Sequence, residues 1–375
     1  MTRYRRCTKC VLDTIANPYI EFDEIGISKS WKVASELHKK YVLTKEESAK
    51  RNQELVDQVK EEGRNNEYDC LIGLSGGVDS SYVAVWAKDN GLRPLAVHFD
   101  NGWNSEIAVT NIKNICDILD IDLITYVVNW EEFVDLQRAM LKASVVDIET
   151  VTDNSHKAVS LGVAKKHNIK YMISGANIAT ENMMPRGWKW NKQDVTNIFD
   201  IHKKFGERPI KSYKTIGQLK WFIMRHTGLG PQYVTPLNNL NFKKFEAMEL
   251  LKERVQWQYY GGKHYESIWT KFYQAFILPT KFNIDKRKVH LSSLILNREI
   301  TRDEALAELD IPLYDPDELE FDKEYVLKKL RFTESEFDKI LTSPIKLHTD
   351  YKSDKKIMDF MLKIWFQVKP LIKKA

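Results

Sequence analysis

Residues 68–81 read Tyr-Asp-Cys-Leu-Ile-Gly-Leu-Ser-Gly-Gly-Val-Asp-Ser-Ser, an apolar run that passes directly into a glycine turn and a helical pattern. The run Tyr68 to Leu74 predicts a buried β-strand, because it is short, apolar and bounded by turn residues. Gly76 and Gly77 allow the backbone to turn sharply and to approach a ligand closely. A helix that begins at Val78 would direct its free amide groups and the positive end of its dipole at this turn. The stretch therefore predicts a strand, a phosphate-binding loop and a helix, in that order.

The side chains of the same loop suit a nucleotide with its metal ion. The hydroxyl groups of Ser75, Ser80 and Ser81 can donate hydrogen bonds to phosphate oxygens. The Asp79 carboxylate repels phosphate, so its expected role is to hold a Mg²⁺ ion between itself and the phosphate groups. We therefore expect ATP and Mg²⁺ as the ligands of the loop.

The loop differs from two other phosphate-binding motifs. It is neither the Gly-x-x-x-x-Gly-Lys-Ser/Thr loop, whose lysine reaches the phosphates, nor the Gly-x-Gly-x-x-Gly fingerprint of dinucleotide-binding proteins. The pattern Ser-Gly-Gly-x-Asp-Ser at positions 75–80 resembles instead the PP-loop of the ATP pyrophosphatase superfamily. The resemblance implies that ATP is cleaved between its α and β phosphates and that AMP is transferred to a carbonyl or carboxyl oxygen.

The segments that follow the loop alternate between helical and strand patterns. Helices are expected over 82–90, 106–119, 131–143 and 156–167, and further strands over 95–99, 123–128 and 170–174. This alternation predicts an α/β fold with a doubly wound parallel sheet, whose ligands bind beyond the carboxyl ends of the strands. Asp100 and the turn Gly175-Ala176-Asn177 follow two of these strands, and the PP-loop resemblance implies that they lie at the nucleotide. The predicted ATP-binding residues are Ser75, Gly76, Gly77, Val78, Asp79, Ser80, Ser81, Asp100, Gly175 and Asn177.

Length and composition suit an enzyme of about two domains. The chain has 375 residues, 43% of them hydrophobic, which is enough for a large buried core. We expect an N-terminal segment and helix over 1–62, an ATP-binding domain over 63–240 and a mainly helical region over 241–375 that binds the second substrate or a partner. The net charge of +5 comes from 57 basic and 52 acidic residues, a balance that argues against a nucleic-acid partner. We find no signal sequence and no apolar run of about 18 residues, so we expect a cytoplasmic protein without a membrane span.

The four cysteines indicate a reducing compartment rather than a disulfide framework. Cys7 and Cys10 form a Cys-x-x-Cys pair, which is half of a tetrahedral Zn²⁺ site. Ser28 and Trp31 stand where a second pair would be expected. Zn²⁺ at Cys7 and Cys10 is therefore one interpretation, and a structural role without metal is the one that we favour.

The chain lacks the cysteine settings of class I glutaminases and of N-terminal-nucleophile glutaminases, which carry Cys at position 2. None of the four cysteines lies in the Gly-x-Cys-x-Gly setting of a class I glutaminase, and residue 2 is Thr rather than Cys. If the reaction uses ammonia from glutamine, the glutaminase must be another chain.

Several further segments resemble the N-acetyl sugar amidotransferase family. They are Ala96–Ser105, Asn129–Phe133, Met184–Arg186 and Tyr260–Ser293, and the similarity extends over residues 1 to about 310. Members of this family turn an N-acetyl group of a bacterial surface sugar into an acetamidino group. The resemblance implies an ATP-dependent amidotransferase of lipopolysaccharide and O-antigen biosynthesis that acts on a nucleotide-activated acetamido sugar. It also implies a glutaminase partner that supplies ammonia, often with a cyclase-like third subunit.

Such a reaction requires positive charge around the reacting atoms more than it requires a protein nucleophile. The predicted catalytic residues are Asp79 with its Mg²⁺ ion, Lys263 and Lys281. The predicted substrate-binding residues are Arg186, His264, Lys286 and Arg287.

Two other interpretations belong to different functional classes. A PP-loop enzyme that modifies tRNA by thiolation or lysidine formation would require a basic surface stripe and, for thiolation, reactive cysteines on loops. A non-catalytic nucleotide-binding module is the third interpretation, and the intact loop argues against it. The basic amphipathic helix expected over 355–369 could dock a partner or a membrane surface, but we favour packing onto its own domain.

Overall fold

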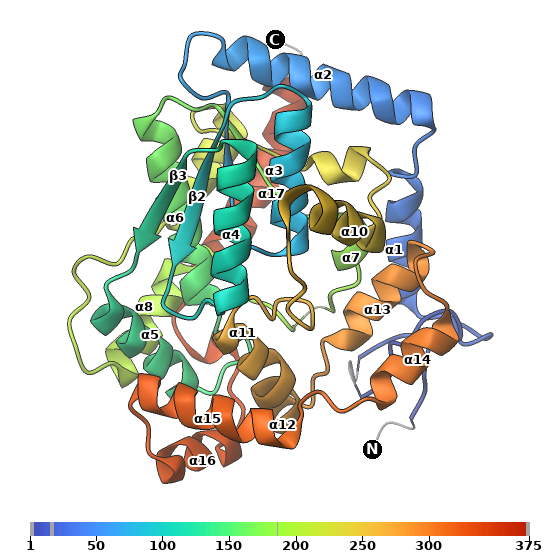
Figure 1. The fold of residues 1–375 in the computed structure, drawn as a ribbon. Coiled ribbons are helices and arrows are strands. Elements are labelled where there is room, and N and C mark those ends of the chain that lie inside the picture. The colour runs from blue at the N-terminus through green and yellow to red at the C-terminus, as the bar shows by residue number, and fades with distance from the viewer. Residues whose placement is uncertain (1–3, 16–18, 186, 373–375) are drawn as a thin grey trace.

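The computed structural model contains a five-stranded parallel sheet with the strand order β3-β2-β1-β4-β5. Figure 1 shows β2 and β3 side by side next to α4 (Glu106–Leu119). The strands are β1 (Cys70–Gly73), β2 (Pro94–Asp100), β3 (Leu123–Val127), β4 (Tyr171–Ile173) and β5 (Gln232–Val234). The chain builds outward from β1 through β2 to β3, and then returns to the other side of β1 to add β4 and β5. The reversal places a topological switch point between β1 and β4, where open α/β sheets bind ligands.

The structure describes residues 4–15, 19–185 and 187–372. The helices of its first half are α1 (Lys29–Lys39), α2 (Lys45–Gly63), α3 (Val78–Asp89), α4 (Glu106–Leu119), α5 (Trp130–Lys142), α6 (Thr150–Lys166) and α7 (Ile178–Glu181). Those of its second half are α8 (Val195–Phe205), α9 (Gln218–Thr227), α10 (Lys244–Val255), α11 (Ile268–Phe272), α12 (Leu278–Phe282), α13 (Arg287–Leu296), α14 (Arg302–Asp310), α15 (Pro316–Leu330), α16 (Glu334–Thr342) and α17 (Lys355–Ile372). Short 3₁₀ turns span Pro236–Asn239 and His348–Asp350, and a π-helical turn spans Tyr273–Ile277.

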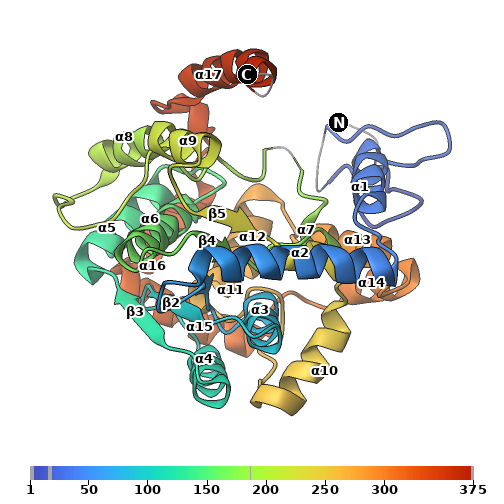
Figure 2. The same ribbon diagram turned by 90° about the horizontal axis from the view of Figure 1, so that it is seen from above.

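Helices cover both faces of the sheet, because successive side chains of a strand point to opposite sides. In β1, Cys70 and Ile72 pack with buried residues of α2, α3, α4 and α10, whereas Leu71 packs with those of α5, α6 and α8. Figure 2 shows α3 and α4 on one side of the sheet and α6 and α8 on the other. The predicted α/β class with a doubly wound parallel sheet is confirmed.

The core continues from the sheet into the C-terminal helices. Leu71 of β1, Phe272 of α11 and Phe337 of α16 belong to one cluster of buried side chains. The predicted boundaries at residues 62 and 240 stay a prediction. Among the described residues, no helix combines the length and apolar character that a membrane span requires.

The predicted elements match the observed ones best where the sequence pattern is strong. The predicted helix over 106–119 coincides with α4, whereas α6 begins at Thr150, six residues before the predicted start. Its first turns contain threonine, aspartate and asparagine, which favour helices weakly, and buried Val151 and Asn154 hold them in place. Strand β5 was not predicted, because it has only three residues and two of them are exposed.

The N-terminal cysteines pack as buried structural side chains. The backbone N–H of Ser28 donates to Cys7 Sγ at 3.3 Å, and the Ser28 hydroxyl caps α1 by accepting from the Trp31 N–H at 3.1 Å. A hydrogen bond from Cys10 lowers the pKa of the Cys7 thiol to about 5. Arg302 donates to the backbone carbonyls of both cysteines at 3.2 Å. The residues present do not fit Zn²⁺, and the described part of the chain holds no group of three or more metal-ligating side chains.

Candidate active site

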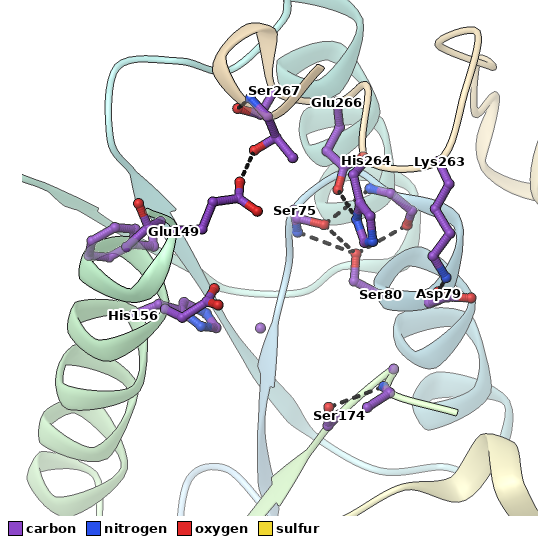
Figure 3. A pocket seen from close by; sticks show the side chains of 18 of the residues that line it. Ser75, Asp79, Ser80, Glu149, His156, Ser174, Lys263, His264, Glu266 and Ser267 are labelled. Atoms are coloured by element: carbon purple, nitrogen blue, oxygen red, sulfur yellow. Dashed lines mark hydrogen bonds and ion pairs between the residues drawn. The ribbon is translucent and has the colours of Figure 1, made fainter. Parts of the chain in front are cut away.

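A cavity of about 650 Å³ lies at the carboxyl ends of β1, β2 and β4 (Figure 3). Its lining comes from the glycine loop, from the start of α6, from the turn after β4 and from the segment between α10 and α12. This is the switch point of the sheet, and the volume suits a nucleotide-sized ligand. We call the side formed by residues 75–80 the loop wall and the side formed by residues 147–157 the α6 wall.

The backbone of the loop wall requires its glycines. Gly76 has a φ of +79°, and a Cβ atom there would lie 2.5 Å from the Ala108 carbonyl oxygen. A Cβ atom at Gly77 would lie 3.2 Å from the Tyr260 hydroxyl and 3.3 Å from Ser75 Oγ. Only glycine therefore fits at Gly76, and any side chain at Gly77 would intrude on the cavity.

The amide groups at the start of α3 are directed at hydroxyl oxygens of the loop wall. The Gly77 N–H donates to Ser75 Oγ at 3.3 Å, and the Val78 N–H donates to the Tyr260 hydroxyl at 3.2 Å. The hydroxyl groups of Ser75 and Ser80 lie 3.1 Å apart. These donors and hydroxyls occupy the N-terminus of a twelve-residue helix, which is the usual position for a bound anion.

Lys263 joins the loop wall to α7. Its Nζ lies 3.4 Å from Asp79 Oδ2 and 3.0 Å from Glu181 Oε1, and it donates to Thr180 Oγ1 at 2.8 Å. Burial would lower the pKa of Lys263, but the two carboxylates raise it above its ordinary value. Burial raises the pKa of Asp79, and the Lys263 ammonium acts in the opposite direction. The predicted catalytic lysine thus lies directly against the predicted metal ligand.

His264 and Glu266 lie above the same loop (Figure 3). His264 has a φ of +68°, a backbone conformation that is costly for a residue other than glycine. Its ring nitrogens lie 3.6 Å from Glu266 Oε1 and 4.0 Å from Glu181 Oε1. The Glu266 backbone carbonyl accepts from the Ser105 N–H at 2.9 Å, which ties this segment to the start of α4. His264 lines the cavity, so it belongs with the candidate active-site residues.

The α6 wall contains charged residues that were not predicted from the sequence. Lys192 pairs with Asp147 at 2.7 Å and with Asp153 at 2.8 Å. Glu149 accepts a hydrogen bond from Thr270 Oγ1 at 2.8 Å, and burial raises its pKa. The sequence pattern that could have identified them is the close spacing of Asp147, Glu149 and Asp153 at the start of a helix. It was not recognised, because the helix was predicted to begin at residue 156.

Most of the predicted ATP-binding residues line the cavity. They are Ser75, Gly77, Val78, Asp79, Ser80 and Gly175. Gly76 and Ser81 lie behind the loop and are buried, and Asn177 is also buried, where it caps α7 by accepting from the Thr180 N–H at 2.9 Å. Asp100 lies instead at a second cavity of about 640 Å³ beside α4. Its Oδ1 accepts from the Gly102 N–H at 2.8 Å, so it shapes the loop after β2.

Two of the predicted cations do not reach the cavity. Lys281 Nζ donates to the backbone carbonyls of Ile340 and Ser343 at 2.6 and 2.8 Å, so it holds the end of α16. Arg287 pairs with Asp285 at 2.9 Å and donates to carbonyls at the end of α14. Neither position supports the predicted catalytic or substrate-binding role.

Two of the remaining predicted substrate-binding residues reach the cavity. Lys286 and His264 line the cavity. Arg186 lies outside the described residues. The cavity is also lined by four lysines that were not predicted from the sequence, namely Lys157, Lys189, Lys192 and Lys244, of which Lys192 is paired with the acids of the α6 wall.

Comparison with protein families matches two separate parts of the chain. Residues 69–187 match the model of the queuosine biosynthesis protein QueC. Residues 266–364 match the model of the C-terminal domain of WbpG-like lipopolysaccharide biosynthesis proteins. No curated protein matches the chain.

Several solved structures show a weak overall similarity. The NMN synthetase from Francisella tularensis shares 16% sequence identity over 76% of this chain and 97% of its own, with a TM-score of 0.34. The U34-tRNA thiolase NcsA from Methanococcus maripaludis, which holds a [4Fe-4S] cluster, shares 15% over 71% of this chain and 81% of its own, with a TM-score of 0.33. The NH3-dependent NAD synthetase from Campylobacter jejuni shares 16% over 56% of this chain and 93% of its own, with a TM-score of 0.29. Similarity of this size supports no inference about activity.

The two family matches agree with the geometry of the cavity. The match over residues 69–187 contains the Ser-Gly-Gly-Val-Asp-Ser loop and the start of α6, and the match over residues 266–364 contains Glu266, Thr270 and Lys286. The chain is thus a PP-loop protein in which a QueC-type domain is joined to a WbpG-like C-terminal domain of lipopolysaccharide biosynthesis.

Proposed function

We propose that the chain is an ATP-dependent amidotransferase that converts an N-acetyl group of a nucleotide-activated bacterial surface sugar into an acetamidino group. One observation carries the proposal. The PP-loop and residues of the WbpG-like domain line a single cavity, so an ATP site and a lipopolysaccharide-biosynthesis domain share one reaction space. The resemblance of residues 96–105 and 260–293 to N-acetyl sugar amidotransferases supports the choice of substrate.

The loop wall fits ATP with Mg²⁺. The amides of Gly77 and Val78 and the hydroxyls of Ser75 and Ser80 would hold the phosphates. Asp79 and Glu181 would hold Mg²⁺, which prefers carboxylate oxygens and completes its shell with phosphate and water. Bound Mg²⁺-ATP supplies an activated AMP group.

The apolar part of the cavity suits the base of the nucleotide. Leu71, Phe99 and Met172 line the cavity from three neighbouring strands, and His156 lies beside them on α6. Small-molecule sites are usually lined by apolar side chains with a few polar groups among them, so this part of the cavity would accept the purine.

The reaction proceeds in two balanced steps. The acetamide oxygen attacks the α-phosphorus of ATP and pyrophosphate leaves, giving an O-adenylyl imidate after loss of the amide proton. Ammonia then adds to the imidate carbon, and AMP leaves with the former acetamide oxygen, so that the product is an amidine. Negative charge develops on the phosphates in the first step, and the nearly buried Lys263 ammonium lies where it would stabilise that charge.

The lysines of the cavity suit an anionic second substrate. Lys157, Lys189, Lys244 and Lys286 line it, and none of them has an ion-pair partner among the described residues. The phosphates of ATP account for part of this charge, and the phosphates of a nucleotide-activated sugar would account for the rest.

Ammonia would come from a separate glutaminase subunit. All four cysteines are buried, and none has the sequence setting of a glutaminase nucleophile. A cyclase-like third subunit would complete the assembly that the family resemblance implies.

The test is a reaction of the purified chain with ATP, MgCl₂, ammonium chloride and a panel of nucleotide-activated diacetamido sugars. We expect AMP and pyrophosphate, and a sugar product lighter by one mass unit because NH replaces O. The Asp79→Asn variant is the negative control. If no sugar supports AMP formation but bulk tRNA does, the proposal is wrong and a tRNA-modifying activity replaces it.

A further inference from the structure

Glu149 occupies an unusual position in the α6 wall. It is the residue before the first turn of α6, and its side chain reaches into the pocket on the side opposite Asp79 and Lys263 (Figure 3). One carboxylate oxygen accepts a hydrogen bond from Thr270 Oγ1 at 2.8 Å. Thr270 belongs to α11, in the WbpG-like domain. Glu149 thus lies where the two domains meet at the cavity.

The other acids of this wall already have a counter-charge. Asp147 and Asp153 both pair with Lys192, at 2.7 and 2.8 Å. No ion pair of Glu149 is found among the described residues, and Lys286 acts on it only at longer range. Glu149 is therefore the carboxylate of the α6 wall whose charge is left for a ligand.

A carboxylate in this place is costly unless it has a cationic ligand. Burial and the nearby Asp153 carboxylate raise the pKa of Glu149, and Lys286 and Lys192 offset this only from longer range. Four lysines without an ion pair among the described residues prepare the rest of the cavity for anions. A sugar phosphate or ATP phosphate beside Glu149 would be repelled. A small cation that donates hydrogen bonds would stabilise the charged carboxylate without this repulsion. Ammonium is such a cation, and the second step of the proposed reaction uses it.

We infer that Glu149 binds ammonium and accepts the proton that the nitrogen must lose during amidation. The inference rests on the proposed function and names the residue that serves its second step. One N–H bond of ammonium breaks and its proton passes to the Glu149 carboxylate. The free electron pair of ammonia then forms the C–N bond as AMP leaves. The second proton released in the step passes to solvent, and Glu149 returns its own proton when product leaves.

The surroundings of Glu149 suit a base. Because burial raises its pKa, Glu149 is a stronger base than an exposed glutamate, as general bases in enzymes commonly are. The charged and titratable groups that face it are Lys286 before α13, Lys192 and Asp147 in loops, Asp153 and His156 on α6, and Tyr273 in the π-helical turn.

The test separates the two steps of the reaction. Exchange of labelled pyrophosphate into ATP, with the acetamido sugar present and ammonia absent, reports sugar adenylation alone. Amidine formation with ammonium chloride reports both steps. For Glu149→Gln we expect exchange within about three-fold of the wild type and amidine formation lower by at least about 100-fold. The acid limb of the amidation pH profile, measured at constant free ammonia, should also disappear.

Matched variants make the result decisive. Glu253→Gln, on the exposed face of α10, should leave both rates unchanged. Glu149→Asp keeps the charge but withdraws it by one methylene group, so it serves if Glu149→Gln does not fold. Loss of amidation by Glu149→Asp with intact exchange supports the inference.

Three outcomes would overturn the inference. Unchanged amidation in both variants would show that no proton passes to Glu149. A parallel loss of exchange and amidation would show that Glu149 only supports the cavity. Absence of sugar-dependent exchange in the wild type would overturn the proposed function itself, and the inference with it.

Discussion

The loop wall and the α6 wall face the same cavity, but backbone amides form the first and charged side chains form the second. The loop wall consists of consecutive residues whose backbone amides donate to the hydroxyls of Ser75 and Tyr260, and a Cβ atom added at Gly76 or Gly77 would crowd its neighbours. The α6 wall consists of charged side chains, and its geometry depends on Lys192 and Thr270 from distant parts of the chain. A wall of amides is sensitive to added volume, whereas a wall of charges is sensitive to lost charge. Substitutions that add volume at one wall or remove charge from the other therefore test whether the two walls have separate roles.

The largest expected effect is at Asp79, the one carboxylate of the loop wall. Asp79→Asn keeps the volume but removes the charge that would hold Mg²⁺ and that pairs with Lys263 at 3.4 Å. We expect AMP formation to fall by roughly 1,000-fold, because metal-bound phosphates lose their anchor. The measurement is AMP release at saturating Mg²⁺-ATP and sugar. A fall of less than ten-fold would contradict the assignment.

Added volume near the loop wall should have the next largest effect. A Cβ atom at Gly175 would lie 2.7 Å from the Asp79 carbonyl carbon, so Gly175→Ala must displace the start of α3. We expect AMP formation to fall by about 100-fold, because a displacement of a fraction of an ångström misplaces the phosphates.

Gly162 provides the matched control for Gly175. A Cβ atom there would meet no heavy atom within 4 Å, and Gly162 lies inside α6. Gly162→Ala should leave AMP formation unchanged and raise the unfolding free energy by up to about 1 kcal/mol. Equal effects of the two substitutions on AMP formation would mean that crowding at the loop is not the cause.

The support of the α6 wall should respond to pH. His348 Nε2 accepts from the Asp147 N–H at 3.3 Å and His348 Nδ1 lies 2.8 Å from Asn197 Oδ1, an arrangement that requires a neutral ring. Burial lowers the pKa of His348 from 6.5 to about 4. Between these values the unfolded chain binds a proton that the folded chain does not, so lowering the pH destabilises the fold. From pH 7 to pH 5 this residue should remove about 2 kcal/mol of unfolding free energy.

Urea unfolding of the wild type and of His348→Gln, at pH 7 and pH 5, measures this contribution. The variant should be less stable at pH 7 but should lose less stability on acidification. The same pH dependence in both proteins would place the titrating group elsewhere.

The smallest effect on catalysis is expected at Lys281, which lies outside both walls. Lys281→Met removes hydrogen bonds to the carbonyls of Ile340 and Ser343 and should lower the unfolding free energy by about 1–2 kcal/mol. AMP formation should stay within about two-fold of the wild type. Lys263→Met is the contrasting variant, with AMP formation expected to fall by about 100-fold. Similar losses of activity in Lys281→Met and Lys263→Met would show that Lys281 does take part in the reaction.

Residues that act through local backbone geometry could be predicted from the sequence. The loop wall follows from Gly76, Gly77 and the helix that begins at Val78, because all its determinants lie within a few residues. The parallel sheet followed from the alternation of strand and helix patterns. The three-residue strand β5 and the first turns of α6 were not predicted, because tertiary packing rather than local conformational preference stabilises them.

Residues whose role depends on where their side chain points in the folded protein were predicted less well. Lys263 and Lys281 lie in the same family-like segment, yet one reaches the cavity and the other the end of α16. Their spacing along the chain does not determine this, because a short irregular segment, α11 and the π-helical turn separate them. Glu149 escaped because its significance depends on Thr270, more than a hundred positions later.

The glycine loop is held in place by residues made much later. The Gly76 carbonyl accepts from Trp257 Nε1 at 2.9 Å, and the Val78 N–H donates to the Tyr260 hydroxyl. During synthesis the ribosome therefore releases the complete PP-loop motif long before the contacts that fix its shape exist. A nascent chain that ends before residue 257 carries the motif but lacks these supports, so its nucleotide site is completed only when the following part of the chain has emerged. The segment with Lys263 and His264 follows directly after these supports, so we expect the loop and its facing residues to be completed together.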